Sequence, residues 1–556
     1  MSDYYDLGPY SRTITAANPD AQMWFDRGLN WTFNFYHEEA VGAYQKALEA
    51  DPDCAMAYWG ISYALGPNYN MPWILYDPAG LKQALGGAYD AMTEALARMD
   101  NCTPAEQAMI KALQARYPQR EPLENVKEMR AWDNAYADAM RDVHQAVPDD
   151  LEARAAYVEA IMNITPWKMW DLKEGAPYKY ARTEEAIAVL DDGFENIPET
   201  WDHPGLLHLH VHLMEMSPFP QKALRTGDRL RTIMPDGGHL VHMPTHIDVL
   251  CGNYQDVLFW NQKAIEADNE TVKRNGAMNF YTLYRVHNFH FATYGAMFLG
   301  QYKPAIEAAQ GLIDTIPEDL LRMESPPMAD FVEGYLPMKQ HVLVRFGKWN
   351  EILEQDLYED DALYCSTNTM ILYAKGVANA ALGNIAEAEA MREEFRASRQ
   401  RVPESRTVHN NKCWDLFDIA EEMLTGEIEY RKGNHDAAFA HLRKSIELDD
   451  NLPYDEPWGW MQPTRHALGA LLLEQGRVEE AEAVYRADLG LDPTLSRACQ
   501  HPDNPWSLHG LYECLMRRGE TAEAIMVKQR LDLAGARADV PITCSCFCRM
   551  ERIAAE

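Results

Sequence analysis

The chain has 556 residues, of which 85 are acidic and 51 basic, and its formal net charge is -34. So large an excess of negative charge opposes binding to the phosphate backbone of a nucleic acid or to an anionic membrane surface, so we expect neither as a partner. The hydrophobic share of 47% and the charged share of 24% are ordinary for a folded protein in water.

The start of the chain, MSDYYDLGPYSRTITAANPD, lacks the basic residues and apolar run of a secretory signal. No apolar run approaches the roughly 20 residues of a membrane helix, so we expect a cytoplasmic protein. Most of the ten cysteines are scattered, as reduced core thiols usually are. Cys544, Cys546 and Cys548 form a C-x-C-x-C segment that suits either a soft metal or a strand with three thiols on one face.

The first predicted helix pair shows the small and aromatic residues of a repeat of about 34 residues. Counted from Ala21, repeat positions 4, 8, 20, 24, 27 and 32 hold Trp24, Gly28, Ala40, Tyr44, Ala47 and Pro52. These are the positions at which paired helices interlock. The next segment, GPNYNMPW, contains two prolines and two asparagines, which predict a loop.

Helical spacing of apolar residues continues through the rest of the chain, and no Gly/Ser-rich or highly charged linker interrupts it. We therefore expect one all-α domain over residues 1–556, an α-solenoid or superhelix of helical hairpins. Its expected parts are an N-terminal repeat and loop (1–80), divergent hairpins (81–200), histidine-rich repeats (201–317), C-terminal repeats (318–535) and a cysteine-containing tail (536–556).

Nine of the 18 histidines lie in one window, from His203 to His290. Six of them form pairs three or four residues apart, so each pair lies on one face of a helix: His208/His212, His242/His246 and His287/His290. The first two pairs are separated by 34 residues, the length of one repeat. Helix packing alone does not require this recurrence, although a single helical histidine is usually a packing residue.

The sequence resembles tetratricopeptide-repeat (TPR) proteins over most of its length. More narrowly, it is similar to a largely uncharacterised group of bacterial and fungal repeat proteins. The shared segments are GPNYNMP, GLLHLHVHLMEMSPFP, GHLVHMPTHIDVLCGNY, HNFHF and NPWSLHGLYECL. The resemblance implies a superhelix in which repeat positions 2, 5, 9 and 12 face the concave groove, but it implies no activity. Counted back from position 20, the residues on that side are the three pairs, Glu215, His239, His466 and His509.

Imidazole is a good ligand for copper, zinc and iron, and two histidines one helical turn apart can occupy two coordination positions of one metal. We therefore predict a metal site formed by the three pairs. Six histidines exceed the need of one zinc ion, which leaves a dinuclear site or a mononuclear site with catalytic histidines. The scarcity of carboxylates favours copper, with zinc or iron as the alternatives.

The predicted function is that of a metal-dependent enzyme, an oxygen-activating copper or iron oxidoreductase acting on a small molecule. Glu215 is a candidate ligand or base, and Tyr284 and Arg285 are further catalytic candidates. The expected substrate contacts are Asn68, Tyr69, His239, His466 and His509. One alternative is a TPR scaffold that binds a peptide or protein in its groove. A zinc hydrolase and a metal-storage protein are the others.

Overall fold

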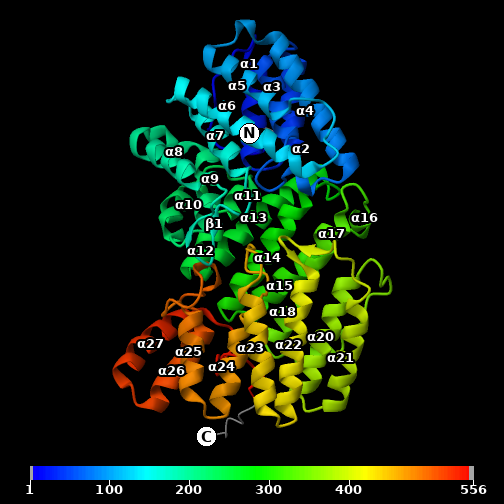
Figure 1. Ribbon diagram of the computed structural model, residues 1–556, viewed down its shortest axis with the longest axis vertical. Coiled ribbons are helices and arrows are strands. Elements are labelled where there is room, and N and C mark those ends of the chain that lie inside the picture. The colour runs from blue at the N-terminus through cyan, green and yellow to red at the C-terminus, as the bar shows by residue number, and fades with distance from the viewer. Residues whose placement is uncertain (1–3, 550–556) are drawn as a thin grey trace. The chain divides into compact units, whose positions relative to one another are not determined.

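The computed structural model describes residues 4–549, and most of these residues lie in helices that pack against their neighbours in the chain (Figure 1). Within these residues the strands are confined to two short antiparallel hairpins, β1 (Trp170–Asp171) with β2 (Ala176–Pro177) and β3 (Thr407–Val408) with β4 (Asn411–Lys412). The predicted all-α, solenoid-type fold is confirmed. None of the described helices is both long enough and apolar enough to cross a membrane.

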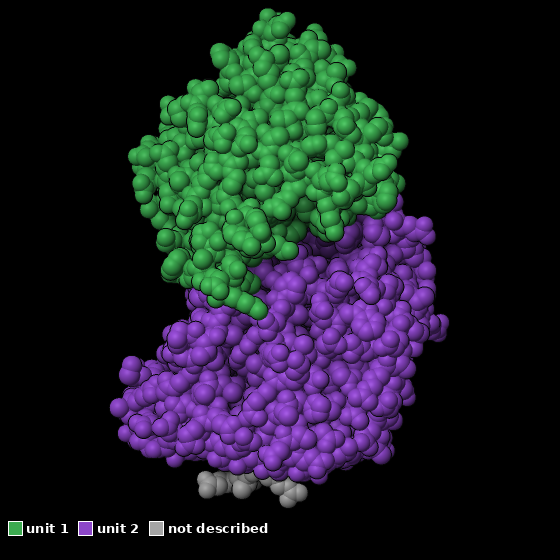
Figure 2. All heavy atoms as spheres, viewed as in Figure 1, with its two compact units in different colours: residues 1–247, 263–274 green, residues 248–262, 275–556 purple. Residues whose placement is uncertain are grey.

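The chain divides into two compact units, residues 1–247 with 263–274 and residues 248–262 with 275–556 (Figure 2). The expectation of one continuous domain stays a prediction. The helices of the first unit are α1 (Pro19–Phe33), α2 (His37–Ala50), α3 (Ala55–Leu65), α4 (Pro78–Arg98), α5 (Pro104–Arg116), α6 (Arg130–Ala146), α7 (Leu151–Met162), α8 (Thr183–Asn196), α9 (Pro204–Glu215), α10 (Leu224–Leu230) and α11 (Gly238–His242). Two helices have residues in both units, α12 (Thr245–Cys251) and α13 (Tyr254–Asn275).

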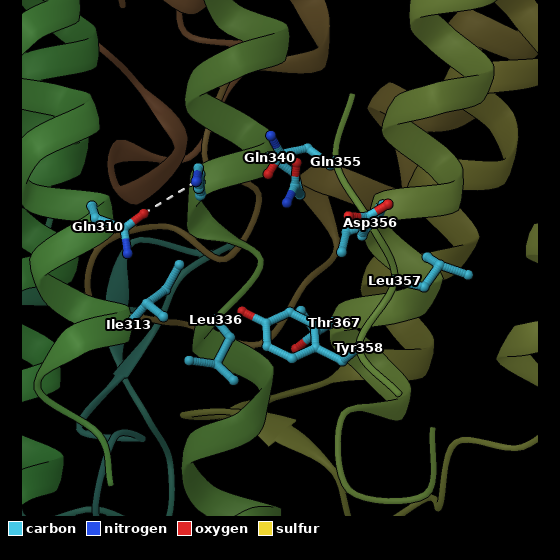
Figure 3. A pocket seen from close by; sticks show the side chains of 11 residues that line it. Gln310, Ile313, Leu336, Gln340, Gln355, Asp356, Leu357, Tyr358 and Thr367 are labelled. Carbon is cyan, nitrogen blue, oxygen red and sulfur yellow. Dashed lines mark hydrogen bonds between the residues drawn. The ribbon is translucent and has the colours of Figure 1, made fainter. Parts of the chain in front are cut away.

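The second unit continues the pairing of helices towards the C-terminus. Its helices are α14 (Thr282–Phe298), α15 (Tyr302–Asp314), α16 (Glu318–Leu321), α17 (Met328–Val332), α18 (Met338–Arg345), α19 (Trp349–Leu353), α20 (Cys365–Ala381), α21 (Ile385–Arg399), α22 (Cys413–Arg431), α23 (His435–Asp450), α24 (Thr464–Glu474), α25 (Val478–Asp488), α26 (Pro505–Arg518) and α27 (Thr521–Ala534). One of them, α19, is only five residues long. The extended chain that follows it lines a cavity (Figure 3).

Glycine and tyrosine at the repeat positions set how closely neighbouring helices approach. Gly28 on α1 and Gly60 on α3 both face the buried ring of Tyr44 on α2. A Cβ atom at either glycine would lie only 2.6 or 2.5 Å from that ring. The same contact recurs in the second unit, where Gly469 and Gly510 face Tyr485. The interlocking positions seen in the sequence therefore do position paired helices, as in TPR-type hairpins.

The C-terminal cysteine segment is neither a strand nor a set of three thiols in the described structure. Cys546 and Cys548 form a disulfide, and the Cys544 thiol donates a hydrogen bond to the Cys546 carbonyl oxygen at 2.9 Å. The segment belongs to the second unit, where the Ser545 hydroxyl donates to the backbone oxygen of His466 at 2.7 Å. The strand prediction for this segment is therefore wrong, because these local contacts replace strand pairing.

Candidate metal centre

Helix α9 carries the first histidine pair, and its start is set by His203 and Pro204. The His203 Nδ1 atom accepts a hydrogen bond from the Leu206 backbone N–H at 3.1 Å, which caps the helix, and Pro204 occupies its first turn. All twelve residues of α9 are buried. A helix buried on every side must find partners for each of its polar side chains. The partners of its histidines therefore define the site.

His208 is held with one ring nitrogen fixed and the other facing a second histidine. Its Nδ1 lies 2.8 Å from the Phe33 carbonyl oxygen, which accepts only an N–H, so the lone pair of the neutral ring is on Nε2. That Nε2 is 3.2 Å from the Nε2 of His239 on α11. Burial, with the neighbouring imidazole of His212, lowers the pKa of His208 well below its usual value. A neutral imidazole is the form that binds metals.

Glu215 orients two further imidazoles. One carboxylate oxygen lies 2.9 Å from His212 Nδ1, and the other lies 2.6 Å from His246 Nδ1. The carboxylate is completely buried. If each Nδ1 donates its proton to the carboxylate, both Nε2 lone pairs are left for a ligand, the arrangement that usually fixes metal-binding histidines. Glu215 is thus placed to hold and polarise two rings at once.

The second predicted pair meets across a helix break. His242 is the last residue of α11, and His246 lies in α12, with Pro244 between them. Proline lacks an N–H and disfavours helical geometry in the residue before it, so the single helix expected here is interrupted. The two Nε2 atoms nevertheless lie 2.8 Å apart. The prediction of one continuous helical face is wrong for this pair, but the two side chains do meet.

The distances between ring nitrogens suit a transition metal. Ligating nitrogens of His208, His212 and His239 lie within 4.8 Å of one another. Two nitrogens each about 2.05 Å from a tetrahedral metal are about 3.3 Å apart, and about 2.9 Å apart in a square plane. The observed Nε2 separations of 3.2 and 2.8 Å match these values. They also match N–H···N hydrogen bonds between neutral rings.

Aromatic side chains surround the cluster. The Phe35 ring lies 4.6 Å from the His208 ring and stacks at 5.4 Å on that of His239, and the Phe35 backbone is left-handed with φ of 54°. The Tyr69 ring lies 4.7 Å from that of His212. The side chain of Asn68 is hydrogen-bonded to His37 Nδ1 at 3.0 Å. The predicted contacts Asn68 and Tyr69 thus belong to the same unit, with Tyr69 directly beside the cluster.

The third pair and its neighbours lie on α14, in the second unit. The ring centres of His287 and His409 lie 6.1 Å apart, and His290 Nε2 lies 2.9 Å from Met461 Sδ. The Arg285 guanidinium donates to the hydroxyl groups of Thr282 and Thr315. The Tyr284 ring stacks on Tyr281. Metal binding by this pair and catalytic roles for Tyr284 and Arg285 stay predictions. The first-unit cluster contains His208, His212, His239, His242, His246 and Glu215.

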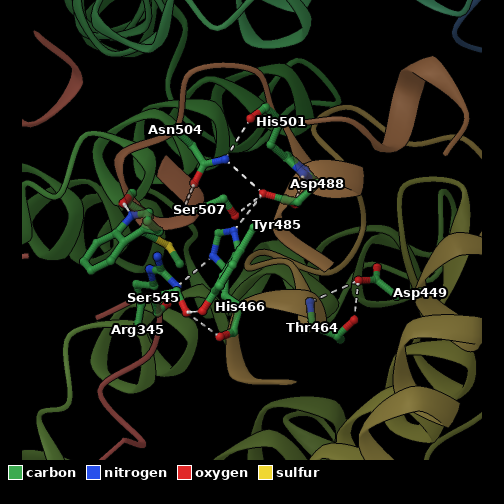
Figure 4. A network of polar contacts seen from close by, with 12 residues as sticks. Arg345, Asp449, Thr464, His466, Tyr485, Asp488, His501, Asn504, Ser507 and Ser545 are labelled. Atoms are coloured by element: carbon green, nitrogen blue, oxygen red, sulfur yellow. Dashed lines mark hydrogen bonds and ion pairs between the residues drawn. The ribbon is translucent and has the colours of Figure 1, made fainter. Parts of the chain in front are cut away.

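His466 belongs to a different, fully buried polar network (Figure 4). Its Nε2 lies 3.0 Å from the Asp488 carboxylate, and its Nδ1 lies 3.1 Å from the Arg345 guanidinium. Asp488 also bonds His501, Asn504 and Ser507. Burial raises the pKa of Asp488, but the electrostatic interactions and hydrogen bonds with His466 and His501 outweigh it and hold that pKa well below its usual value. The network ties α24, α25 and α26 together.

Both ring nitrogens of His466 are engaged in that network, and His509 is half-buried on α26. Substrate roles for these two residues stay predictions. The sequence predicts His239 only as a substrate contact, whereas its Nε2 lies 3.2 Å from the Nε2 of His208, close enough for the two rings to bind one metal. The signal was present in the sequence, because His239 is three residues before His242, one helical turn away.

No protein-family model matches the chain, and no curated protein matches it. Several solved structures match the chain at low similarity. A monomeric mutant of IFIT1 with Gppp-AAAA is 12% identical with a TM-score of 0.34, over 86% of this chain and 90% of that chain. The Cut9–Hcn1 hetero-tetramer of the APC/C is 12% identical with a TM-score of 0.29, over 93% and 94%. Naa15/Naa10 bound to HypK-THB is 13% identical with a TM-score of 0.22, over 93% and 70%.

Proposed function

We propose that the first unit binds a transition metal through the imidazoles of His208, His212, His239, His242 and His246, and that the chain is a metal-dependent enzyme. The observation that supports this most directly is the fixed orientation of the rings. Nδ1 of His208 faces a backbone carbonyl, while Nδ1 of His212 and of His246 faces Glu215. These contacts favour the tautomer in which the ring lone pair is on Nε2, the form in which an imidazole binds a metal.

The donor set favours copper, with zinc or iron as alternatives. All five proposed ligands are imidazole nitrogens, which bind these metals better than magnesium or calcium. The nitrogens fall into a set of three (His208, His212, His239) and a pair (His242, His246), and Glu215 orients one member of each. This division suits two metal ions or one ion with two further histidines.

We propose an oxidoreductase that activates oxygen and acts on a small molecule. The ligands are 0–2% exposed, and aromatic rings lie against them, so a reactive oxygen species formed there would be shielded from bulk water. A zinc ion at the same nitrogens would instead activate water for hydrolysis, and a site with no access for substrate would store metal. The identity of the bound metal separates the first two chemistries.

The test is the metal content of protein purified without a histidine tag, measured by inductively coupled plasma mass spectrometry. We expect stoichiometric copper, zinc or iron in the natural protein, and loss of it in the His208→Gln and His242→Ala/His246→Ala variants. His210→Gln is the matched control, because His210 lies on the same buried helix but bonds the Thr226 hydroxyl at 2.8 Å. Protein that is metal-free and cannot be loaded with any of the three metals would refute the proposal.

A scaffold that binds a protein partner is the second candidate. The last helical hairpin exposes large apolar side chains, with exposed fractions of 63% for Ile525, 67% for Met526 and 73% for Leu533. The terminal repeat of a solenoid usually has a polar outer face. The net charge of -34 makes a protein a better partner than RNA. Failure of metal loading, with helical structure intact, would leave this candidate in place of the enzyme.

A further inference from the structure

The second unit contains a cavity of about 300 Å³ between α15, α18 and α20. It exists because α19 stops after five residues at Leu353. The chain then runs on as Glu354 to Asp361, which includes five carboxylates. Negative charge is unfavourable at the C-terminal end of a helix, where the helix dipole is negative. The segment therefore leaves the helix and lines the cavity in extended form, where a longer helix would have packed.

This wall of the cavity is held firmly. The side chain of Asn368 on α20 is 1% exposed and forms two hydrogen bonds with the backbone of this segment. Its Oδ1 accepts from the Tyr358 backbone N–H at 2.8 Å, and its Nδ2 donates to the Tyr358 carbonyl oxygen at 3.0 Å. The Tyr358 ring also stacks on Tyr364 at 4.3 Å. The cavity is therefore preformed, which reduces the entropy lost when a ligand binds.

A buried amide in the cavity has a hydrogen-bonding atom to spare. Gln340 is 4% exposed, and its side-chain oxygen has no hydrogen-bond partner within the described residues. A buried carbonyl left without a donor destabilises the fold. The Gln340, Gln310 and Tyr358 side chains converge on the same space (Figure 3). The arrangement is suited to a ligand with several polar groups.

One cation lies at the edge of the cavity without a carboxylate partner. The Lys339 ammonium donates to the neutral amide oxygen of Gln310 at 3.1 Å, and no ion pair of Lys339 is found among the described residues. Gln310 in turn donates to Asp314 at 2.9 Å. An ammonium bound only by an amide keeps donors for an anion. The exposed Asp356 carboxylate on the opposite wall disfavours a second negative charge.

We propose that this cavity binds a small hydroxylated monocarboxylate, of the sugar-acid class. Lys339 binds the carboxylate, and the Gln340 amide group and the Tyr358 hydroxyl form hydrogen bonds with the hydroxyl groups. Leu336, Ile313 and Ile371 cover the carbon chain. A six-carbon molecule fits a cavity of about 300 Å³. The site lies in the second unit and does not depend on metal binding by the first.

The test is calorimetric titration of the full-length protein with three six-carbon probes. D-gluconate has both a carboxylate and hydroxyl groups, sorbitol has only hydroxyl groups, and hexanoate has only a carboxylate. We expect gluconate to bind at least about tenfold more tightly than either of the others, the effect of losing one charge-assisted hydrogen bond. Equal affinities for the three, or no binding of gluconate, would overturn the proposal.

Two variants assign the contacts. Lys339→Met should reduce the affinity for gluconate to that for sorbitol while leaving sorbitol binding unchanged. Gln340→Met should weaken both gluconate and sorbitol binding about tenfold without lowering thermal stability, because it removes an amide oxygen that has no partner. The matched controls are Lys303→Met, on the exposed face of α15, and Gln400→Met, also exposed. Gluconate binding that survives both cavity variants, with circular dichroism unchanged, would refute the assignment.

Discussion

At the scale of single residues, the centre of the first unit depends on one carboxylate. Glu215 bonds His212 and His246 through different oxygens, at 2.9 and 2.6 Å. A carboxylate can accept both hydrogen bonds because it is an acceptor at each oxygen. An amide of the same shape accepts at one end and donates at the other. The ring that faces the donor must then place its own proton on Nε2, where it blocks a metal ligand.

Glu215→Gln should therefore weaken metal binding by about 10- to 100-fold while leaving the helices in place. The measurement is competition with a chromophoric chelator, using the metal that the natural protein is found to contain. Glu195→Gln is the control, because Glu195 is an exposed glutamate on α8 of the same unit. Unchanged affinity in Glu215→Gln would mean that the two imidazoles need no carboxylate to orient them, and that Glu215 serves packing alone.

At the scale of helices, the sequence predicts the interlocking positions well, because they depend on local spacing. Gly28 and Tyr44 lie at repeat positions 8 and 24, and the Tyr44 ring packs against the Gly28 backbone as predicted. Sequence spacing places His242 and His246 on one helix, which is wrong because Pro244 interrupts the helix between them. It also missed the part of His239 in the cluster, because the partner, His208, lies 31 residues away and meets it only through packing.

Gly28→Ala tests the interlocking directly. The new Cβ atom would lie 2.6 Å from the Tyr44 ring, and Tyr44 cannot move freely because it is fully buried and bonded to Thr32 at 3.1 Å. Overpacking of this kind costs about 1–3 kcal/mol. We expect the free energy of unfolding, from urea denaturation, to fall by that amount for the transition that includes the first unit.

Gly42→Ala on α2 is the matched control for that substitution. A Cβ atom there meets nothing within 4 Å, and alanine is the better residue in a helix by about 0.5–1 kcal/mol. We expect this variant to be slightly more stable than the natural protein. A Gly28→Ala protein as stable as Gly42→Ala would show that α1 and α2 can separate without loss, and that the repeat contact is not tightly packed.

At the scale of the whole molecule, burial keeps many histidines neutral in an acidic chain. Burial lowers the pKa to about 4 for His37, His210, His341 and His466, and to about 3 for His290. Burial shifts the pKa of three carboxyl groups upwards instead, and so also favours their neutral form. The pKa rises to about 7 for Asp133, about 8 for Glu159 and about 6 for Asp449. The composition predicts the net charge, but only the fold decides which groups are neutral.

The sign of the histidine effect follows from linkage. Below a pH of about 6.5 the unfolded chain binds a proton at each of these histidines, whereas the folded chain does not until the pH nears its lowered pKa. Above about pH 6.5 these histidines are neutral in both states and do not oppose folding. As the pH falls from about 6.5 to about 4, proton binding by the unfolded chain lowers the free energy of unfolding. The carboxyl groups with raised pKa give the reverse trend, since the folded chain holds their protons up to pH 6–8.

A comparison of the natural protein with His341→Gln isolates one histidine from these opposing contributions. His341 lies in the second unit, packs edge-on against Trp460 at 4.8 Å, and has its pKa lowered to about 4 by burial alone. As the pH falls from 7 to 4.5, the natural protein should lose about 2–3 kcal/mol more stability than the variant, because the variant has no imidazole to protonate when it unfolds. Urea denaturation across that range, in the presence of a chelator so that metal binding does not contribute, gives the difference directly. Parallel stability curves would mean that His341 is accessible to protons in the folded protein, and that the region around Trp460 opens readily.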